Sequence, residues 1–291
     1  MTRRLGVLVA LGAVLATATA GGQQPPTAPA VTFFDGFDRS ALDRNSWNVI
    51  ITGRTVNTVN NEQQAYVDST DTIDVVGGAA AEGADGGALR LTARWRPGFT
   101  TPEGRRFDFT SGRIDSRGKM EFTYGTVSAR IRMTAGAGLW PAFWVLGGGP
   151  WPATGEMDIM ENVGDPSWTN VALHGPGYSG NTPLVKRRAF PSGQDATGWH
   201  VYTMTWTRDG FVFTVDDDPF YRVSRTEVEA HGAWAYDNPK HLLINLALGG
   251  AYPQSVNTVD TPYAGLPAPT VDLIKRDEAR MLIDWVRVTG R

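Results

Sequence analysis

Three carboxylates lie close together in the segment Gly155–Asn162, where Glu156, Asp158 and Glu161 alternate with large apolar residues. In a regular strand Glu161 would point into the core, where a lone buried carboxylate is costly, while the other two acids faced the opposite side. A bulge between Asp158 and Glu161 adds one residue and returns Glu161 to the face of its neighbours. Crowding of three acids raises at least one pKa. This pattern suits glycoside hydrolysis, in which one carboxylate stays ionised and another stays protonated near neutral pH.

The spacing of the two glutamates favours a retaining mechanism. With the bulge, their Cα atoms are separated by about four strand steps, or roughly 13 Å. Two long side chains that lean toward each other can close to the ~5.5 Å that a retaining glycosidase requires, with Asp158 between them. The alternative is an acidic, solvated strand face without catalytic function. Aspartate and glutamate are poor strand formers, and the aromatic residues nearby are hard to explain as a solvated surface.

Those aromatic residues form a second candidate element of the site. Trp140, Phe143, Trp144 and Trp151 precede the acids directly. Indole faces stack on the apolar faces of pyranose rings, so tryptophan beside paired carboxylates indicates a sugar polymer as substrate. We expect Phe143 and one of the three tryptophans to pack in the core instead. His174, which starts a His-Gly-Pro-Gly turn, is either structural or positioned to bind sugar or tune Glu161.

The elements that must hold these residues are short strands. From Val31 onward, β-prone segments with alternating apolar and polar residues are separated by Gly, Pro, Asn and Asp, and very little sequence favours helix. Many short strands predict an all-β fold, a sandwich of two sheets or a barrel, in one domain over residues 31–291. The Gly/Ala-rich segment 77–87 and the proline-rich segment 252–277 are predicted to be irregular loops, and the second is expected to border the groove.

The N-terminus differs from the rest of the chain. Arg3 and Arg4 precede an apolar run that ends in small residues at Ala18-Thr19-Ala20. This order predicts a secretory signal peptide over residues 1–20, because the apolar run is too short to span a bilayer. An uncleaved membrane anchor is the alternative. Residues 21–30 are predicted to be a flexible leader, and the mature protein is expected to be secreted and free of the membrane.

Composition excludes several classes of function. The 291 residues contain no cysteine, which excludes a disulfide scaffold, thiolate metal sites and thiol catalysis. The 27 basic and 30 acidic residues nearly balance, which argues against nucleic acid as a partner. An exported chain without disulfides must therefore draw its stability from its core.

Taken together, these residues resemble glycoside hydrolase family 16, and within it the laminarinase-like endo-β-1,3-glucanases. The Glu-x-Asp-x-x-Glu signature of the family is matched by Glu156, Asp158 and Glu161. The resemblance extends over essentially residues 31–291. Further matching segments, in chain order, are 33–38, 60–66, 112–116, 124–125, 129–131, 140–144, 174–177, 245–250 and 283–287.

The resemblance implies a β-jelly roll with a concave substrate cleft and a retaining mechanism. Glu156 would be the nucleophile, Glu161 the general acid and base, and Asp158 would hold Glu156 and share a proton with it. The extra residue Met160 would mark the bulged, laminarinase-type form of the signature and would touch sugar near the cleavage point.

The resemblance also implies residues that bind sugar or metal. Substrate would be bound on the glycone side by Asn60, Arg130, Trp140 and Trp144 and on the leaving-group side by His174, with Trp151 as a further platform. Alternation with period two favours Asn60 over Asn61, because Asn60 would share a strand face with Glu62 and Gln64. No cofactor is required for the chemistry. A structural Ca²⁺ on the convex side would be held by the backbone carbonyls of Gly36 and Gly87 and the carboxylate of Asp284, an incomplete shell that water must fill.

The resemblance leaves the substrate open between related polymers. The expected substrate is β-1,3-glucan, with mixed β-1,3-1,4-glucan also accepted, and the expected enzyme is a monomer. Alternatives are a hydrolase of β-galactan, agar or carrageenan, or a glucan-binding protein that does not cut. A sulfated substrate would favour more Arg and Lys around the groove, so the near-neutral charge favours an uncharged glucan. Thr154 stands where relatives commonly carry cysteine.

Overall fold

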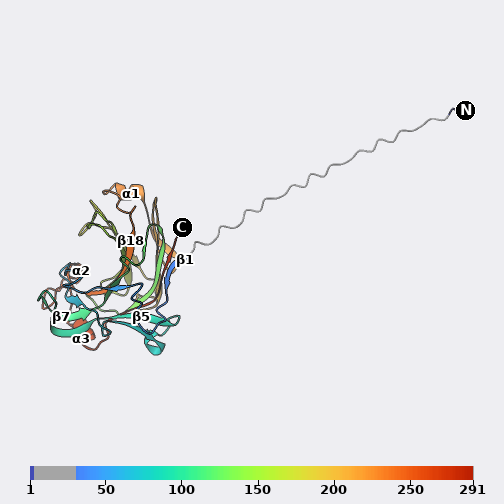
Figure 1. Cartoon of the computed structure of the whole chain (residues 1–291). Helices are drawn as coiled ribbons and strands as arrows, with labels where there is room; N and C mark the ends of the chain where they lie inside the picture. The colour runs from blue at the N-terminus through green and yellow to red at the C-terminus, as the bar shows by residue number, and fades with distance from the viewer. Residues whose placement is uncertain (3–30, 291) are drawn as a thin grey trace.

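Alternation of apolar and polar residues produces strands throughout the part of the chain that this computed structural model describes, residues 1–2 and 31–290. Two antiparallel eight-stranded sheets pack face to face (Figure 1), which confirms the predicted all-β jelly-roll sandwich. Sheet A contains, in spatial order, β17 (Asp218–Ser224), β16 (Gly210–Val215), β15 (His200–Thr207), β10 (Gly125–Met133), β19 (Arg280–Thr289), β5 (Gly87–Thr92) and β4 (Ile73–Gly77), with β1 (Val31–Asp35) paired to β19.

Sheet B holds the candidate site. Its strands are, in spatial order, β14 (Leu184–Ala189), β13 (Trp168–His174), β12 (Glu156–Glu161), β11 (Leu139–Gly147), β18 (Lys240–Leu248), β8 (Arg113–Asp115) and β2 (Asn48–Val49), with β9 (Glu121–Phe122) paired to β18. A third, small sheet of β3 (Gln64–Tyr66), β7 (Arg106–Ser111) and β6 (Arg94–Thr100) lies beside it.

The core lies between the two large sheets. In β10, every second side chain is buried, so Val127, Ala129 and Ile131 enter the core while Arg130 points to the opposite face of sheet A. In β18 all nine residues are buried, because the core covers one face of the strand and the other face forms the floor of the site. A central strand covered on both faces explains this continuous burial.

The two segments predicted to be irregular contain short helices. Residues 77–87 include the 3-10 helix η1 (Gly78–Ala81), and about half of residues 252–277 lies in α2 (Ala251–Asn257) and α3 (Ala268–Lys275). Helix α3 packs on β6. Helix α1 (Arg225–Glu229) lies at the opposite end of the sandwich from α3 (Figure 1).

The predicted signal peptide and leader fall on residues 3–30, which lie outside the described part of the chain. Among the described residues, no helix is long and apolar enough to cross a membrane.

Candidate active site

The predicted bulge is present in β12 and brings the three acids onto one face. Glu161 pairs with Asn170 of β13, and Asp158 pairs with Ala172. Between these two pairs β12 advances by three residues, whereas β13 advances by two. The same extra residue shifts the register against β11. Because of this insertion, the apolar residues of β12 pack in the core while all three carboxylates line the same cleft.

The cleft has a volume of about 390 Å³ and lies on the face of sheet B that points away from sheet A. Strands β11, β12 and β18 form its floor, and the segment that precedes β3 borders it. Its lining residues are Val56, Val59, Asn60, Glu62, Tyr66, Arg113, Trp140, Ala142, Trp144, Leu146, Trp151, Glu156, Asp158, Glu161, Asn245 and Ala247.

Tryptophans make up much of the apolar surface of this cleft. Trp140, Trp144 and Trp151 all line it, so the expectation that one of them packs in the core is wrong. Phe143 is fully buried, as expected. Trp151 is half exposed at the rim, and its ring lies 6.1 Å from that of His174. The indole N–H of Trp144 donates to Asn245 Oδ1 at 2.8 Å, which fixes the ring in the floor.

Glu161 is held by two neutral donors. Trp140 Nε1 donates to its Oε1 and Asn170 Nδ2 to its Oε2, both at 2.8 Å. Tyr252 of α2 donates to Asn170 Oδ1 at 3.2 Å and meets the Trp140 ring edge-on, so segment 252–277 borders the site through α2. Burial, and then the charge of Asp158, raise the pKa of Glu161 to about 7, although the two hydrogen bonds oppose the rise. A carboxyl group held this way keeps its proton close to neutral pH.

Glu156 and Asp158 share His174. The imidazole Nε2 lies 3.3 Å from Asp158 Oδ2 and 3.7 Å from Glu156 Oε1. Burial, and then the charge of Asp158, raise the pKa of Glu156 to about 8. Burial lowers the pKa of His174, but its hydrogen bond to Asp158 and the surrounding carboxylates outweigh this and raise the pKa to about 9. His174 therefore acts on Glu156 and Asp158 more directly than on Glu161, the acid named in one of the alternatives for its role.

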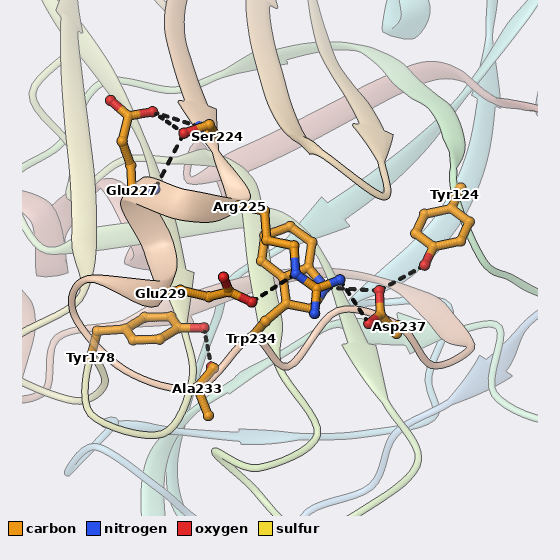
Figure 2. Close-up of polar contacts among 9 residues, drawn as sticks. All are labelled: Tyr124, Tyr178, Ser224, Arg225, Glu227, Glu229, Ala233, Trp234 and Asp237. Atoms are coloured by element: carbon orange, nitrogen blue, oxygen red, sulfur yellow. Dashed lines mark hydrogen bonds and ion pairs between the residues drawn. The ribbon is translucent and has the colours of Figure 1, made fainter.

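The turn after His174 is braced by the loop that follows α1. Tyr178 donates from its hydroxyl to the carbonyl of Ala233 at 2.9 Å (Figure 2), and Ala233 N donates to Pro176 O at 3.1 Å. Figure 2 also shows how the loop is secured at its far end, where Arg225 pairs with Asp237 at 3.2 Å. The position of His174 thus depends on contacts far from its own strand.

Three polar residues of the cleft were not singled out from the sequence. Glu62 is buried and accepts hydrogen bonds from Gln64 at 2.8 Å and Tyr66 at 3.3 Å, and burial raises its pKa against the opposing charge of Arg113. The Arg113 guanidinium lies 5.0 Å from the Trp144 ring. Glu62, Tyr66 and Arg113 all sit inside segments that match the family, but the segments do not say which of their side chains meet.

Asn60 lines the cleft for a reason other than the one predicted. It lies in a turn with φ of 53°, in the left-handed region that asparagine tolerates, and not on a strand face shared with Glu62 and Gln64. Its carbonyl accepts from Ala251 N at 2.7 Å, which ties this turn to the start of α2.

Two predicted sugar-binding residues are corrected. Met160 is buried in the core opposite Phe143, because the bulge turns it inward together with Ile159. Arg130 lies on β10 of sheet A, where Nη1 donates to Asp284 Oδ2 at 2.5 Å and to Gly83 O at 2.8 Å. The repeated pattern of β10 predicts that Arg130 avoids the core, but it does not say which sheet the strand joins.

The same ion pair decides how well the predicted calcium ligands fit a cation. Asp284 is buried at an irregularity of β19 next to Arg130. Its Oδ1 accepts from Asp85 N at 2.9 Å and its Oδ2 is held by Arg130, so both oxygens are engaged. Gly87 begins β5 and Gly36 follows β1, and both of these strands pair with β19, so the two glycines do lie near this strand. A guanidinium in direct contact with the carboxylate repels a second cation, and the three residues as arranged do not fit Ca²⁺.

Glu156, Asp158 and His174 also offer ligand atoms within 4.8 Å of one another. A metal there would require neutral His174, and its pKa of about 9 opposes that. The arrangement fits a proton-handling group of acids better than a metal centre.

Comparison with known proteins agrees with this geometry. The family model of glycosyl hydrolases family 16 matches residues 45–265. A beta-glucanase from Rhodothermus marinus is 31% identical over 99% of this chain and 94% of its own. The endo-beta-1,3-glucanase of Pyrococcus furiosus superposes with a TM-score of 0.75 at 30% identity over 89% of this chain and 95% of its own. The laminarinase catalytic domain of Thermotoga maritima gives 0.73 at 29% identity over 90% and 98%. The chain is a glycoside hydrolase and belongs to glycosyl hydrolases family 16.

Proposed function

We propose that this protein is a secreted, retaining, endo-acting hydrolase of β-1,3-glucan that also accepts mixed β-1,3-1,4-glucan. The observation that carries the proposal is the open, tryptophan-lined cleft with Glu156, Asp158 and Glu161 on its floor. The names of the relatives, beta-glucanase, endo-beta-1,3-glucanase and laminarinase, support the same substrate class.

In the proposed first step, the Glu156 carboxylate attacks the anomeric carbon while Glu161 gives its proton to the departing glycosidic oxygen. The C–O bond to the leaving sugar breaks, and a covalent glycosyl–enzyme forms. In the second step Glu161 takes a proton from water, the water oxygen attacks the same carbon, and Glu156 leaves as a carboxylate. Two inversions at that carbon retain the β configuration.

The raised pKa of Glu161 supports its role as the acid, whereas the raised pKa of Glu156 opposes its role as the ionised nucleophile. Glu161, with a pKa of about 7, carries the proton that the first step needs. Glu156 must be ionised, and burial, which raises its pKa to about 8, opposes this. The charge of His174, whose Nε2 lies 3.7 Å from Glu156 Oε1, favours the ionised form of Glu156. We assign these protons to the coupled group as a whole.

An uncharged glucan fits the electrostatics of the cleft. Of the residues that line it in the described part of the chain, Arg113 is the single basic one, and Glu62 balances its charge. A sulfated agar or carrageenan would need more cationic donors. A glucan-binding protein that does not cut is disfavoured, since all three acids are in place.

Further parts of the proposal rest on the sequence and on the ion pair of sheet A. We propose that residues 1–20 direct export, that the mature protein is extracellular, and that it acts as a monomer without a partner protein. No cofactor takes part in the steps above. We also propose that Arg130 takes over the role that a structural cation would have beside Asp284.

The test is release of reducing ends from a panel of laminarin, lichenan, galactan and agarose. We expect fast release from laminarin, slower release from lichenan and none from agarose. Binding of laminarin without release would contradict the hydrolase proposal, and preference for galactan would move the substrate to the alternative class.

A further inference from the structure

Lys240 is a fully buried lysine at the start of β18. Its Nζ donates to Thr154 O at 2.5 Å, to Asn238 Oδ1 at 2.8 Å and to Ala235 O at 3.1 Å. An ammonium group has three donors, and three neutral oxygens accept them.

The ammonium has no carboxylate partner within ion-pair distance among residues 31–290. The rings of Tyr236 and Trp206 lie 5.7 and 5.9 Å from Nζ and close the site. Burial lowers the pKa of Lys240 to about 7, while Asp237 opposes the change. A charged group in such surroundings is costly, so the three oxygens must stay in place to compensate for the lost water. The lysine therefore ties together the segments that supply them.

One of these segments leads directly into the candidate nucleophile. Thr154 is separated from Glu156 by Gly155 alone, which has φ of 71° and packs so closely that a side chain would lie 2.3 Å from Ala235 O. The turn 151–155 therefore sits against Ala235, with Lys240 bridging the two carbonyls. The same turn presents Trp151 at the rim of the cleft.

The second segment, residues 233–238, contacts His174. Tyr236, next to Ala235, donates from its hydroxyl to His174 O at 3.1 Å. His174 is the register partner of Glu156 across β12 and β13. The segment 233–238 thus contacts the chain on both sides of the Glu156–His174 pair.

We propose that Lys240 is a positioning residue, which fixes the turn 151–155 against the segment 233–238 and so sets Glu156 in register with His174. It touches no substrate and acts through Thr154 and Ala235. This inference rests on the proposed function, because its effect is measured on glucan hydrolysis.

The test compares K240M with K119M. Met keeps the length of the side chain and removes every donor. Lys119 is a suitable control, because its Nζ also donates to backbone carbonyls, those of Arg44 and, at 2.8 Å, Trp47, but it is exposed and outside the cleft. Well below the unfolding midpoint, and normalised to folded protein, we expect kcat on laminarin to fall about 10- to 100-fold in K240M, since small misplacements of reacting groups are costly. KM should change less than threefold, and K119M should retain kcat within twofold.

A second readout separates positioning from general loss of stability. Burial is the largest cause of the raised pKa of Glu156, and a loosened turn admits water while Asp158, His174, Glu161 and Arg113 stay in place. The acidic limb of kcat/KM should therefore move to lower pH by about half a unit or more in K240M. If K240M does not fold, N238A removes one of the three acceptors and should shift the limb in the same direction. An unchanged limb with wild-type kcat in either folded variant would overturn the inference, whereas a wild-type enzyme that does not cut laminarin would instead contradict the proposed function.

Discussion

Both large sheets bury carboxylates, but of Asp284 on sheet A and Glu156 and Glu161 on sheet B, only Asp284 is in contact with an arginine. On sheet B, Glu156 and Glu161 lie together in a cleft, and no arginine of residues 31–290 forms an ion pair with them; burial raises both pKa values. On sheet A, Asp284 is more deeply buried than either glutamate, but Arg130 contacts it at 2.5 Å. A permanent cation makes a buried acid a structural element, and its absence leaves the acid able to exchange protons near neutral pH.

The largest expected effect is on the cleft. Glu156→Ser removes the proposed nucleophile, and the rate of laminarin hydrolysis should fall by at least about 10³-fold, while binding is retained. Glu121→Ser on β9, outside the cleft, should leave the rate within twofold. Reducing-end assays and equilibrium binding of laminarin check both. Substantial residual turnover of the Glu156 variant would move the nucleophile to another residue.

The next largest effect is on sheet A. Arg130→Met leaves Asp284 buried without its cation, which should lower the free energy of unfolding by about 2–4 kcal/mol. Arg132→Met is the matched control. Arg130 and Arg132 both lie over the Trp199 ring, at 5.0 and 4.9 Å, but Arg132 forms no ion pair among residues 31–290. Urea unfolding measures both variants, and kcat below the transition should be unchanged. Equal destabilisation by the two substitutions would show that the ion pair with Asp284 has no special part in stability.

A third prediction concerns the pH dependence of stability that follows from the raised pKa of Glu156 in the cleft. The pKa of Glu156 is near 4.5 when unperturbed and about 8 in the folded protein. The folded state therefore holds the proton more tightly, and the stability from this group is complete below about pH 4.5 and lost as pH rises through about 8. Glu156→Gln cannot ionise, so it should exceed the wild type in stability by roughly 3–4 kcal/mol at pH 8 and by about 1 kcal/mol at pH 5. Urea midpoints between these pH values check this, and a difference that does not change with pH would contradict the raised pKa.

The smallest expected effect concerns calcium. Arg130 already forms an ion pair with the carboxylate of Asp284. The unfolding midpoint of the wild type should therefore change by less than about 1 °C between millimolar Ca²⁺ and EDTA. Arg130→Met exposes the carboxylate and should gain a Ca²⁺-dependent rise of about 2 °C or more. Differential scanning calorimetry measures both. A clear rise in the wild type would restore the metal site that the resemblance implies.

Some of the site could be predicted because its signals are local. The bulge follows from the conflict between period two and the burial of Glu161, and the nearby tryptophans share one short segment with the acids. The sandwich follows from strands such as β10, whose alternation is complete. These inferences need no knowledge of which segments meet in space.

The rest depends on contacts between distant segments. Arg130 alternates correctly out of the core, but only the pairing of β10 with β19 shows that it faces Asp284 instead of the cleft. In the sequence, Lys240 likewise resembles an ordinary strand residue, because the carbonyl of Thr154 to which it donates lies 86 positions away. The proline-rich segment 252–277 suggested a loop, yet proline near the first turn of α3 is a recognised helix start.

We propose that Glu156 and Glu161, which have no arginine partner within ion-pair distance among residues 31–290, carry out retaining hydrolysis of β-1,3-glucan. Proton NMR during the first minutes of laminarin hydrolysis by the wild-type enzyme tests it most directly, because the anomer released first reports the stereochemistry at the cleaved carbon. We predict that β-anomeric reducing ends appear first and only later equilibrate with the α form. Initial release of the α-anomer would contradict it.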